Sequence, residues 1–554
     1  MDIRSGNRMP KRIARRRLLA LTGVAAFVAA CGSESSKETV ATTTAGQGPV
    51  TSGSAPKEAE PKTGGTVRVG IAAEPTNLDP HTGGSGAEHQ FMYPVYDQLI
   101  AYDQKGQLDP SQSLAEKWEL AEPTRVVLKL RTGVTFTDGT PLNAAAVKWN
   151  LDRIIDPATK ATPRPDLAAI ERVEALSATD LVLRLKEPSA PLLTNLGDRG
   201  GMMISPPAFE KAGKDEYRRN PVGSGPFVLK EFVSDARLVY ERNPAYWRKD
   251  ASGRGLPFAQ RLRLDIIPDN TVRVAALESG EIDVIQSTPA QDVKRLGANK
   301  DFQLTRFVGA GTIHSVVNHG FAPLDNVWFR RAVAAGHDRE SYIKNFLTGE
   351  EPVAAALLTP ASWAFEPNVP AYPYEIAKAK EYLQRSGLPP SAWRIKVVPK
   401  GTSVSDNESF FENSLKSAGI VVEWLKGERE SVFLRLWKGL GADGTAAMNL
   451  QGSWSMRVDP DGNCGQFYTE KGTYNPGQAP VPELEPLMLR ARQIYDQTER
   501  KKLYSEIQRL AAEHVYSSMP IHYTIADAHA STKVGNFAAY YGGEGKARFA
   551  NLWI

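Results

Sequence analysis

Two stretches of the sequence have part of the spacing that a ligand-binding loop requires. Residues 439–444 (GLGADG) match the Gly-x-Gly-x-x-Gly pattern of nucleotide-binding loops. Such a loop follows a strand and opens a helix, so that the phosphate meets the helix N-terminus. Here residues 430–438, which have helical spacing, come before the glycines. We therefore interpret 439–444 as a glycine cluster that ends a helix, and not as a nucleotide site.

The second stretch imitates part of a calcium-binding loop. Residues 459–463 (DPDGN) alternate oxygen-bearing side chains, and Glu470 stands at the twelfth position. The sixth position is Cys464, where the loop needs glycine for its sharp turn, and no helix leads into it. We expect no calcium site here, and we interpret Cys464 as a small buried hydrophobe.

The other residues that could do chemistry form no catalytic set along the chain. Gly-x-Ser-x-Gly, Gly-x4-Gly-Lys-Ser/Thr and His-Glu-x-x-His are all absent from the sequence. Among the eight histidines, His314 and His319 are the closest pair, and a strand would point them to opposite faces. We expect a protein that is not an enzyme and that holds no cofactor and no metal. A secreted, lipid-anchored hydrolase whose catalytic residues are dispersed along the chain stays an alternative.

Composition and charge describe a soluble globular protein. The chain has 554 residues, 41% of them hydrophobic and 23% charged, which predicts two or three domains. Lysine and arginine number 67 against 63 acidic residues, but seven of the cations lie within residues 1–30. The rest of the chain therefore offers no basic field for nucleic acid. The two cysteines, Cys31 and Cys464, exclude a framework of disulfides.

Residues 1–30 have the organisation of a secretory signal peptide. A basic head (Arg12–Arg17) precedes thirteen uncharged residues at 18–30, too few for a spanning helix. Residues 28–31 (VAAC) resemble a bacterial lipobox, a resemblance that implies lipidation of Cys31. An ordinary signal peptide with a chance cysteine stays an alternative. The run 15–19 (RRRLL) also resembles a twin-arginine signal, so the export route remains open.

Residues 31–62 are predicted to form a flexible tether. They contain no aromatic residue, and Gly, Ser, Thr, Ala and Pro supply 21 of the 31 positions from 32 to 62. Such a segment buries too little apolar surface to offset its chain entropy. A coil of this length spans about 30 Å on average, enough to hold a globular body off a membrane.

From residue 63 onward the pattern predicts a mixed α/β body. Alternating apolar residues predict strands, and apolar spacing of three to four predicts helices. The expected strands are 66–71, 125–130, 181–185 and 262–266, and the expected helices are 143–155, 270–279, 327–335, 375–386, 483–497 and 499–514. Asp138-Gly139 predicts a tight turn, and Thr498 is the expected N-cap of the last helix.

Several blocks of sequence, in a fixed order, resemble one family. These blocks are 114–118 (LAEKW), 130–142 (LRTGVTFTDGTPL), 221–227 (PVGSGPF), 243–247 (NPAYW) and 325–333 (DNVWFRRAV). From about residue 63 to its end the chain resembles the bacterial extracytoplasmic solute-binding proteins, family 5, which serve peptide, dipeptide and nickel ABC importers. For the blocks themselves we expect structural roles, with Trp118 and Trp247 in the core.

The resemblance implies a type II periplasmic-binding-protein fold with two lobes and an inserted subdomain. Residues 63–103, 214–310 and 526–554 would form the first lobe, 104–213 the inserted subdomain and 311–525 the second lobe. A solute would be enclosed between the lobes, and ligand would shift the balance between open and closed forms.

The function that the resemblance implies is capture of a small solute or oligopeptide outside the cytoplasmic membrane. The chain would be a monomer, held at the membrane through lipid on Cys31, and would deliver its solute to ABC permease subunits. A metal-chelate or heme carrier of the same fold stays an alternative.

One segment, 454–462 (WSMRVDPDG), bears on the ligand. Oligopeptide- and dipeptide-binding members have an aspartate near the place of Arg457 that pairs with the peptide's amino group; this chain resembles instead the branch with glutathione-binding and generic peptide-binding proteins. The resemblance implies ligand contacts from Trp454, Ser455, Arg457 and Asp459. A guanidinium in the cleft favours a carboxylate. Two alternatives stay open: Arg457 pairs only with Asp459, and Trp454 packs in the core.

Overall fold

A computed structural model describes residues 60–554 except 85, 400–402, 426–446, 456 and 544, with the backbone only at 447–455. The predicted signal peptide, Cys31, nearly all of the tether and the glycine cluster 439–444 lie outside these residues. Where the chain is described, no helix has both the length and the apolar content that crossing a bilayer requires.

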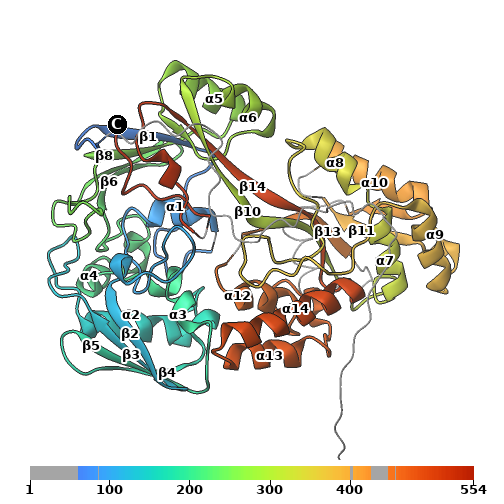
Figure 1. Cartoon of the computed structure of the whole chain (residues 1–554), viewed down its shortest axis with the longest axis horizontal. Coiled ribbons are helices and arrows are strands. Elements are labelled where there is room, and N and C mark those ends of the chain that lie inside the picture. Colours follow the sequence, from blue (N-terminus) through green and yellow to red (C-terminus); the bar gives the residue numbers. More distant parts are fainter. Residues whose placement is uncertain (1–59, 85, 400–402, 426–446, 456, 544) are drawn as a thin grey trace, which may run out of the picture. The chain divides into compact units, whose positions relative to one another are not determined.

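Ten strands form one mixed sheet, in the order β12-β11-β13-β10-β14-β9-β1-β8-β7-β6 (Figure 1). The strands are β1 (Thr66–Ile71), β6 (Phe227–Val233), β7 (Arg237–Arg242), β8 (Arg261–Ile266), β9 (Val284–Ile285), β10 (Phe302–Val317), β11 (Arg394–Val398), β12 (Val421–Trp424), β13 (Ala447–Ser455) and β14 (Ser518–Ser531). β1 lies parallel to β8 and β9, with Val67 opposite Leu262 and Val69 opposite Leu264. The alternation predicted for both strands thus buries one shared apolar face.

The two longest strands, β10 and β14, form an antiparallel pair in the middle of this sheet (Figure 1). Their register runs from Phe302 opposite Ser531 to Val316 opposite Ser518, with an irregularity between Val308 and Thr312. Gly309 lies inside the irregularity with φ +80°, a backbone angle that favours glycine. On the far side of the irregularity β10 also pairs with β13.

A second sheet has four antiparallel strands in the order β2-β3-β5-β4. They are β2 (Ala115–Glu122), β3 (Arg125–Leu130), β4 (Ile170–Ala175) and β5 (Asp180–Leu185). The helix α2 (Ala144–Ile155) contacts β4 and β5 and buries Val147, Leu151 and Ile154. Asn143 caps it by accepting a hydrogen bond from the Ala146 amide.

The remaining described α-helices cover the two sheets or connect their strands. They are α1 (His89–Met92), α3 (Leu192–Asn195), α4 (Pro206–Tyr217), α5 (Asn270–Ser279), α6 (Ala290–Gly297), α7 (Val327–Gly336), α8 (Arg339–Phe346), α9 (Ile376–Arg385), α10 (Asp406–Ala418), α12 (Pro460–Phe467), α13 (Glu485–Gln493) and α14 (Gln497–His514).

The expected N-cap of α14 was wrong by two residues. Asp496, not Thr498, precedes the helix, and its carboxylate accepts a hydrogen bond from the Glu499 amide at 2.8 Å. The carboxylate accepts a hydrogen bond from this amide and is also attracted to the positive end of the helix dipole, so the helix begins two residues earlier. The predicted turn at Asp138-Gly139 is confirmed, since Gly139 has φ +86° and residues Thr135 and Pro141 bridge across it.

Buried apolar side chains gather into separate clusters. One cluster surrounds β1, β7 and β8 and includes side chains from 528–552; another fills the four-stranded sheet with residues from 99 to 203. Two more draw on residues between 316 and 521. Cys464 is fully buried in the last of these, as expected. The division into lobes at the residues given above stays a prediction.

Asp97 forms hydrogen bonds to two of the sequence blocks that resemble the family, 221–227 and 243–247. Its buried carboxylate accepts hydrogen bonds from Ser224 Oγ at 3.0 Å, Tyr246 OH at 2.9 Å and Trp247 Nε1 at 2.9 Å. Burial raises the pKa of Asp97, and the three donors act against that rise. Trp247 is partly buried and packs against the core, not within it as expected, and its bond to Asp97 ties the block 243–247 to the block 221–227.

Candidate functional site

Arg457 lies in the loop between β13 and α12, and the loop is fixed by Asn463. The Asn463 side chain accepts from the Arg457 amide at 3.1 Å and donates to the Arg457 carbonyl at 3.0 Å. The alternating residues 459–463 are the start of α12, with Asp459 as N-cap and Pro460 in the first turn. Among the described residues there is no group of three acidic, histidine or cysteine side chains that could hold a metal ion.

Asp459 has a structural partner, and this partner is not Arg457. Its carboxylate accepts two hydrogen bonds from the guanidinium of Arg500, at 2.7 and 2.8 Å. Asp459 is 3% exposed and Arg500 5% exposed, so the pair is buried between α12 and α14. The expected alternative in which Arg457 pairs with Asp459 is therefore wrong, because the buried Arg500 occupies both oxygens of that carboxylate.

Arg457 instead pairs with Asp166, which is 291 residues away in the sequence. Its Nη1 lies 2.8 Å from each oxygen of that carboxylate, and 31% of its side chain is exposed. Asp166 sits in a short turn, Pro165–Leu167, ahead of β4. Burial lowers the pKa of Arg457, but Asp166 and Asp198 outweigh it and the pKa stands above its usual value. Arg457 is a fixed cation.

The pair lines a small cavity, which we call the Arg457 cavity. Its other polar lining residues are Tyr93, Tyr102, Thr194, Asn195, Asp198, Asp459 and Lys546. Lys546 Nζ lies 3.0 Å from the Asp198 carboxylate, which also pairs with the His89 ring. Burial, together with Lys546, lowers the pKa of His89 to about 4, so this ring is neutral at pH 7. Of the three acidic residues in the lining, Asp459 pairs with Arg500, while Asp166 pairs with Arg457 and Asp198 with Lys546.

The Arg457 cavity is too small to hold a solute in this form. Its volume is about 20 Å³, room for about one water molecule. A small-molecule site needs hundreds of cubic ångströms. While Arg457 and Asp166 stay paired, the cavity between them has no room for a solute.

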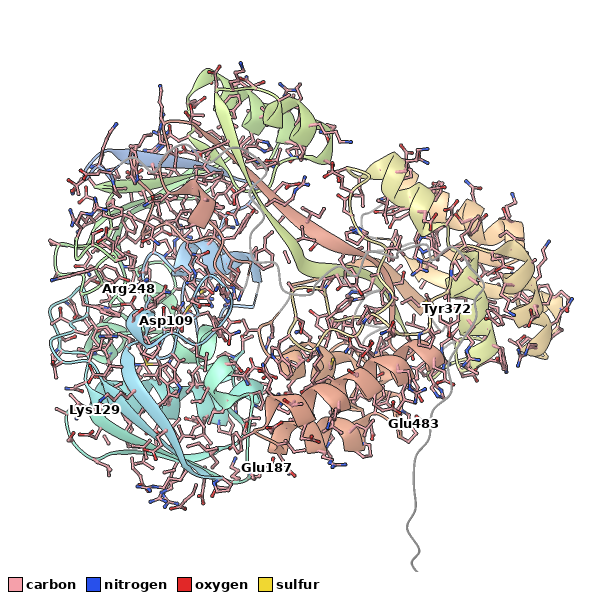
Figure 2. All side chains as sticks on the ribbon, in the orientation of Figure 1. Asp109, Lys129, Glu187, Arg248, Tyr372 and Glu483 are labelled. Atoms are coloured by element: carbon pink, nitrogen blue, oxygen red, sulfur yellow. The ribbon has the colours of Figure 1, made fainter. Side chains whose placement is uncertain are left out.

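A second contact joins the same two regions of the chain near Glu187, labelled in Figure 2. The Ala190 amide donates to the Arg492 carbonyl at 2.7 Å, and Gln493 Nε2 donates to Glu187 at 3.2 Å. Tyr495 OH accepts from the Ser189 amide at 3.1 Å and donates to the Pro123 carbonyl at 2.8 Å. These bonds hold the α13–α14 connection against loops of the four-stranded sheet.

Trp454 and Ser455 belong to β13, whose backbone alone is described. Trp454 pairs with Thr312 of β10 and Ser455 with Gly311, next to the irregularity in that strand. The strand leads directly into the Arg457 loop. Whether their side chains contact a ligand stays a prediction.

A larger cavity, which we call the strand-end cavity, lies at the carboxyl ends of β1 and β9. Its volume is about 300 Å³, and its lining includes Ile71–Glu74, Thr76, Glu88, Gln90, Arg273 and Gln286. Parallel strands bring their carboxyl ends to one edge of a sheet, where α/β proteins commonly bind ligands. Sequence reasoning missed this cavity. Ala72-Ala73-Glu74 after a predicted strand was the available signal, but the two-residue β9 gave none.

A chain of polar contacts links the two cavities. Glu88, in the strand-end cavity, accepts from Thr76 Oγ1 at 2.6 Å and from Arg199 at 3.0 Å. The next residue along the chain is His89, which binds Asp198 of the Arg457 cavity. The two cavities are therefore neighbours through the consecutive residues Glu88 and His89.

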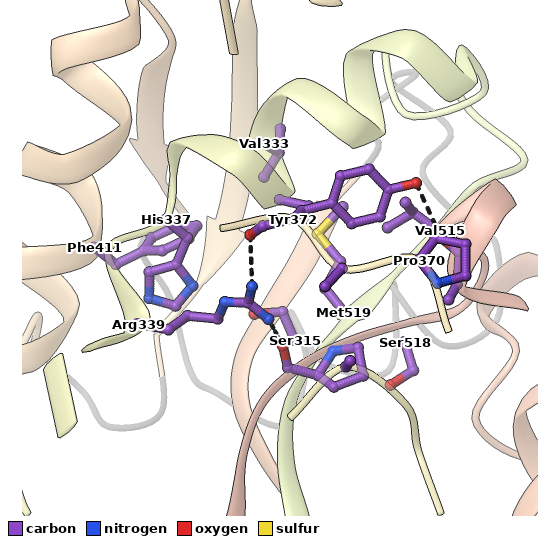
Figure 3. A pocket seen from close by; sticks show the side chains of 15 residues that line it. Ser315, Val333, His337, Arg339, Pro370, Tyr372, Phe411, Val515, Ser518 and Met519 are labelled. Carbon is purple, nitrogen blue, oxygen red and sulfur yellow. Dashed lines mark hydrogen bonds between the residues drawn. The ribbon is translucent and has the colours of Figure 1, made fainter. Parts of the chain in front are cut away.

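A third cavity, enclosed among residues 315–520, is a packing feature. It measures about 30 Å³ and its walls are mostly apolar. Arg339 Nη2 donates to the Tyr372 carbonyl at 2.5 Å and Nη1 to the Pro520 carbonyl at 3.2 Å (Figure 3). These bonds tie three segments of the core together, and the space holds about two waters.

Comparison with known proteins gives these sites a family context. Residues 109–475 match the model of the bacterial extracellular solute-binding proteins, family 5. A probable D,D-dipeptide-binding periplasmic protein, DdpA of Escherichia coli K12, is 26% identical over 472 residues, 80% of this chain and 86% of that protein. The glutathione-binding protein GsiB of the same strain is 30% identical over 324 residues, 58% of this chain and 62% of that protein.

Solved structures agree on the fold. The periplasmic binding protein DppA from Helicobacter pylori, in complex with the peptide STSA, superimposes with a TM-score of 0.76 at 22% identity. That likeness covers 89% of this chain and 98% of the other. The chain has the α/β fold of type II periplasmic binding proteins, and it belongs to the bacterial extracellular solute-binding proteins of family 5.

Proposed function

We propose that this chain is the solute-capturing component of an ABC importer and that its solute is a peptide or a peptide-like molecule with a carboxylate. The observation that carries the proposal is the ion pair between Arg457 and Asp166 across a cavity formed by distant segments. Relatives named for binding D,D-dipeptides and glutathione support the class of solute.

The mechanism is exchange of one carboxylate for another on a fixed guanidinium. Asp166 holds Arg457 in place, and a solute carboxylate takes over both of its hydrogen-bond positions. Charge-assisted bonds of this kind contribute about 1.5–3 kcal/mol each. The enclosed solute would then be presented to membrane permease subunits without any covalent change, so no catalytic step belongs to this function.

The same proposal includes an anchor. Lipid on Cys31, followed by the tether 31–62, would hold a monomeric body at the outer face of the cytoplasmic membrane or in the periplasm. Mass spectrometry of protein extracted from membranes tests this part, because a diacylglyceryl group on Cys31 adds a defined mass and an unmodified Cys31 contradicts the anchor.

The binding test uses native mass spectrometry with an equimolar library of random tripeptides. The unmodified protein is expected to retain part of the library. Arg457→Ala is expected to weaken retention by about 10- to 100-fold, since charge-assisted bonds are lost. Arg490→Ala, an exposed arginine on α13, serves as the matched control and should retain the library as before.

Three results would contradict the proposal or part of it. If no peptide is retained, the solute is not a peptide. Tightly bound metal or a visible absorption band would favour a metal-chelate or heme carrier. Equal retention of C-terminally amidated peptides would remove the role of Arg457.

A further inference from the structure

The α13–α14 connection and the loops of the four-stranded sheet meet through hydrogen bonds, at a place that we call the Tyr495 contact. Tyr495 OH accepts from the Ser189 amide at 3.1 Å and donates to the Pro123 carbonyl at 2.8 Å. The Ala190 amide donates to the Arg492 carbonyl at 2.7 Å. One phenol thus uses both its donor and its acceptor on the opposite side, so it joins two separate loops there.

The two sides of the Tyr495 contact belong to different apolar cores. Pro123 and Ser189 lie in loops of the sheet whose cluster is built from residues 99–203, whereas Tyr495 lies between helices whose cluster draws on residues 316–516. Among the described residues, no apolar side chain belongs to both clusters. Separating the two sides therefore divides neither core, and the bonds that must break are hydrogen bonds and ion pairs.

The chain passes between the two bodies on a pair of strands that can bend. β10 buries Phe307 in the cluster around β1 and, further along, Val317 in a cluster that extends to residue 521. The cluster around β1 packs together with that of the four-stranded sheet, since Val222 contacts both. Between these two parts of β10 the ladder with β14 is interrupted around Gly309, which has φ +80°. An interrupted ladder with a glycine lets a long strand pair change direction.

The ion pair of the Arg457 cavity crosses the same boundary. Arg457 precedes α12, which buries Phe467 in the cluster of the helices. Asp166 precedes Leu167, which is buried in the cluster of the four-stranded sheet. The ion pair and the Tyr495 contact therefore join the same two bodies at two separate places. Bodies that are joined twice part only when both contacts break, so the two contacts stabilise each other.

We propose that the Tyr495 contact is a latch that keeps Arg457 and Asp166 paired, and that it must release before a solute can reach Arg457. Every group of the latch comes from the chain itself, so this closed form needs no solute. A net hydrogen bond favours the closed form by about fivefold, and the two bonds of the Tyr495 hydroxyl together by about 25-fold. Capture would therefore begin with a conformational step that depends on none of the solute's chemistry.

Hydrogen exchange at the Ala190 amide measures release of the latch. In segment 187–192, Pro188 and Pro191 have no amide, so mass spectrometry of this segment reports few amides besides those of Ser189 and Ala190. The whole protein is exchanged in buffer that contains no peptide. Tyr495→Phe should accelerate exchange at Ala190 by about 25-fold, although the acceptor of this amide is a backbone carbonyl that the substitution leaves in place.

A second variant distinguishes a latch from a local loop contact. Arg457→Ala removes no bond of the Tyr495 contact, but it removes the other contact between the two bodies. It should accelerate exchange at Ala190 by about two- to fivefold, because a partly exposed ion pair contributes modestly. Should Tyr495→Phe fail to fold, Gln493→Ala takes its place: it removes a hydrogen bond to Glu187 from an exposed side chain and should accelerate exchange by up to about fivefold.

Two controls accompany these variants. Tyr374→Phe changes a tyrosine that is 40% exposed, and it should leave exchange at Ala190 as it is. The amides of β3, which pairs with β5, should be equally protected in every variant, because the latch can release without unfolding the four-stranded sheet.

Three results would overturn the inference. Exchange at Ala190 as fast as in an unfolded peptide would show that there is no latch, and unchanged exchange in Tyr495→Phe would show that its hydroxyl does not hold the two bodies together. Acceleration by Tyr495→Phe but not by Arg457→Ala would reduce the contact to local packing of one loop. Each of these results would leave the proposed function standing, because peptide retention is measured separately.

Discussion

Arg457 and Arg500 each pair with an aspartate, but one ion pair is partly exposed and the other is buried. Arg500 lies between α12 and α14 and satisfies a buried carboxylate that also caps a helix. Arg457 lies beside a cavity, partly exposed, and its partner comes from a distant segment. A buried pair holds a fold because neither charge can return to water, whereas a partly exposed pair can exchange partners.

At this scale we expect two different losses of stability. Arg500→Met leaves Asp459 buried and uncompensated, and should cost about 3–5 kcal/mol of unfolding free energy. Arg457→Ala should cost at most about 1 kcal/mol, because Asp166 can be hydrated. Urea unfolding followed by circular dichroism measures both. Similar losses in the two variants would show that Arg457 is as structural as Arg500.

The residues of the site were only partly predictable, because the sequence does not show which side chains meet in the folded protein. Arg457 was named from its segment, but nothing in the sequence joins it to Asp166 or brings Asp198 and Lys546 beside them. Those contacts depend on how distant elements pack.

Elements with a clear period were predicted well, and short ones were not. Strands β1, β3, β5 and β8 and helix α2 agree with their expected ranges to within a residue or two, since each has enough residues to display its alternation or its helical spacing. Strand β9 has two residues and α1 has four, too few for any period. Both border the strand-end cavity, so the missed elements and the missed site have one cause.

The connections between elements depend on Asp97. This carboxylate joins the segment after α1 to the blocks 221–227 and 243–247 through three donors. Asp97→Ala leaves those buried donors unpaired and should cost about 3 kcal/mol or more, while Asp97→Asn keeps one oxygen acceptor and should cost less. Thermal unfolding of the three proteins checks the order. Equal stability of all three would mean that packing alone holds these blocks.

Across the whole molecule, burial of histidine sets the response to acid. Burial lowers the pKa of seven of the eight histidines, in six cases to about 3 or 4: His81, His89, His314, His319, His337, His522 and His529. In the unfolded chain the same rings take up protons near pH 6.5. Between about pH 6.5 and 4 the unfolded state therefore binds more protons than the folded state does.

Stability should accordingly be constant above about pH 7 and should fall as the pH drops from 6.5 toward 4, because the folded state alone must keep these rings neutral. Asp461, whose pKa burial raises to about 6, acts in the opposite direction, as do Asp97, Asp265 and Asp527, whose pKa values burial also raises, but the seven histidines outnumber these four carboxyl groups. Urea titrations at pH 7.5, 6 and 5 give the unfolding free energies. A flat profile over this interval would contradict the burial of the histidines.

The position of Cys464 has a practical consequence. It lies fully buried on α12, and burial raises the pKa of its thiol, so the folded protein offers almost no thiolate there. Alkylating reagents attack the thiolate. In a chain that starts after residue 31, a single cysteine introduced on the surface would be the only reactive one, and a fluorescent dye attached to it could report solute uptake without background from Cys464.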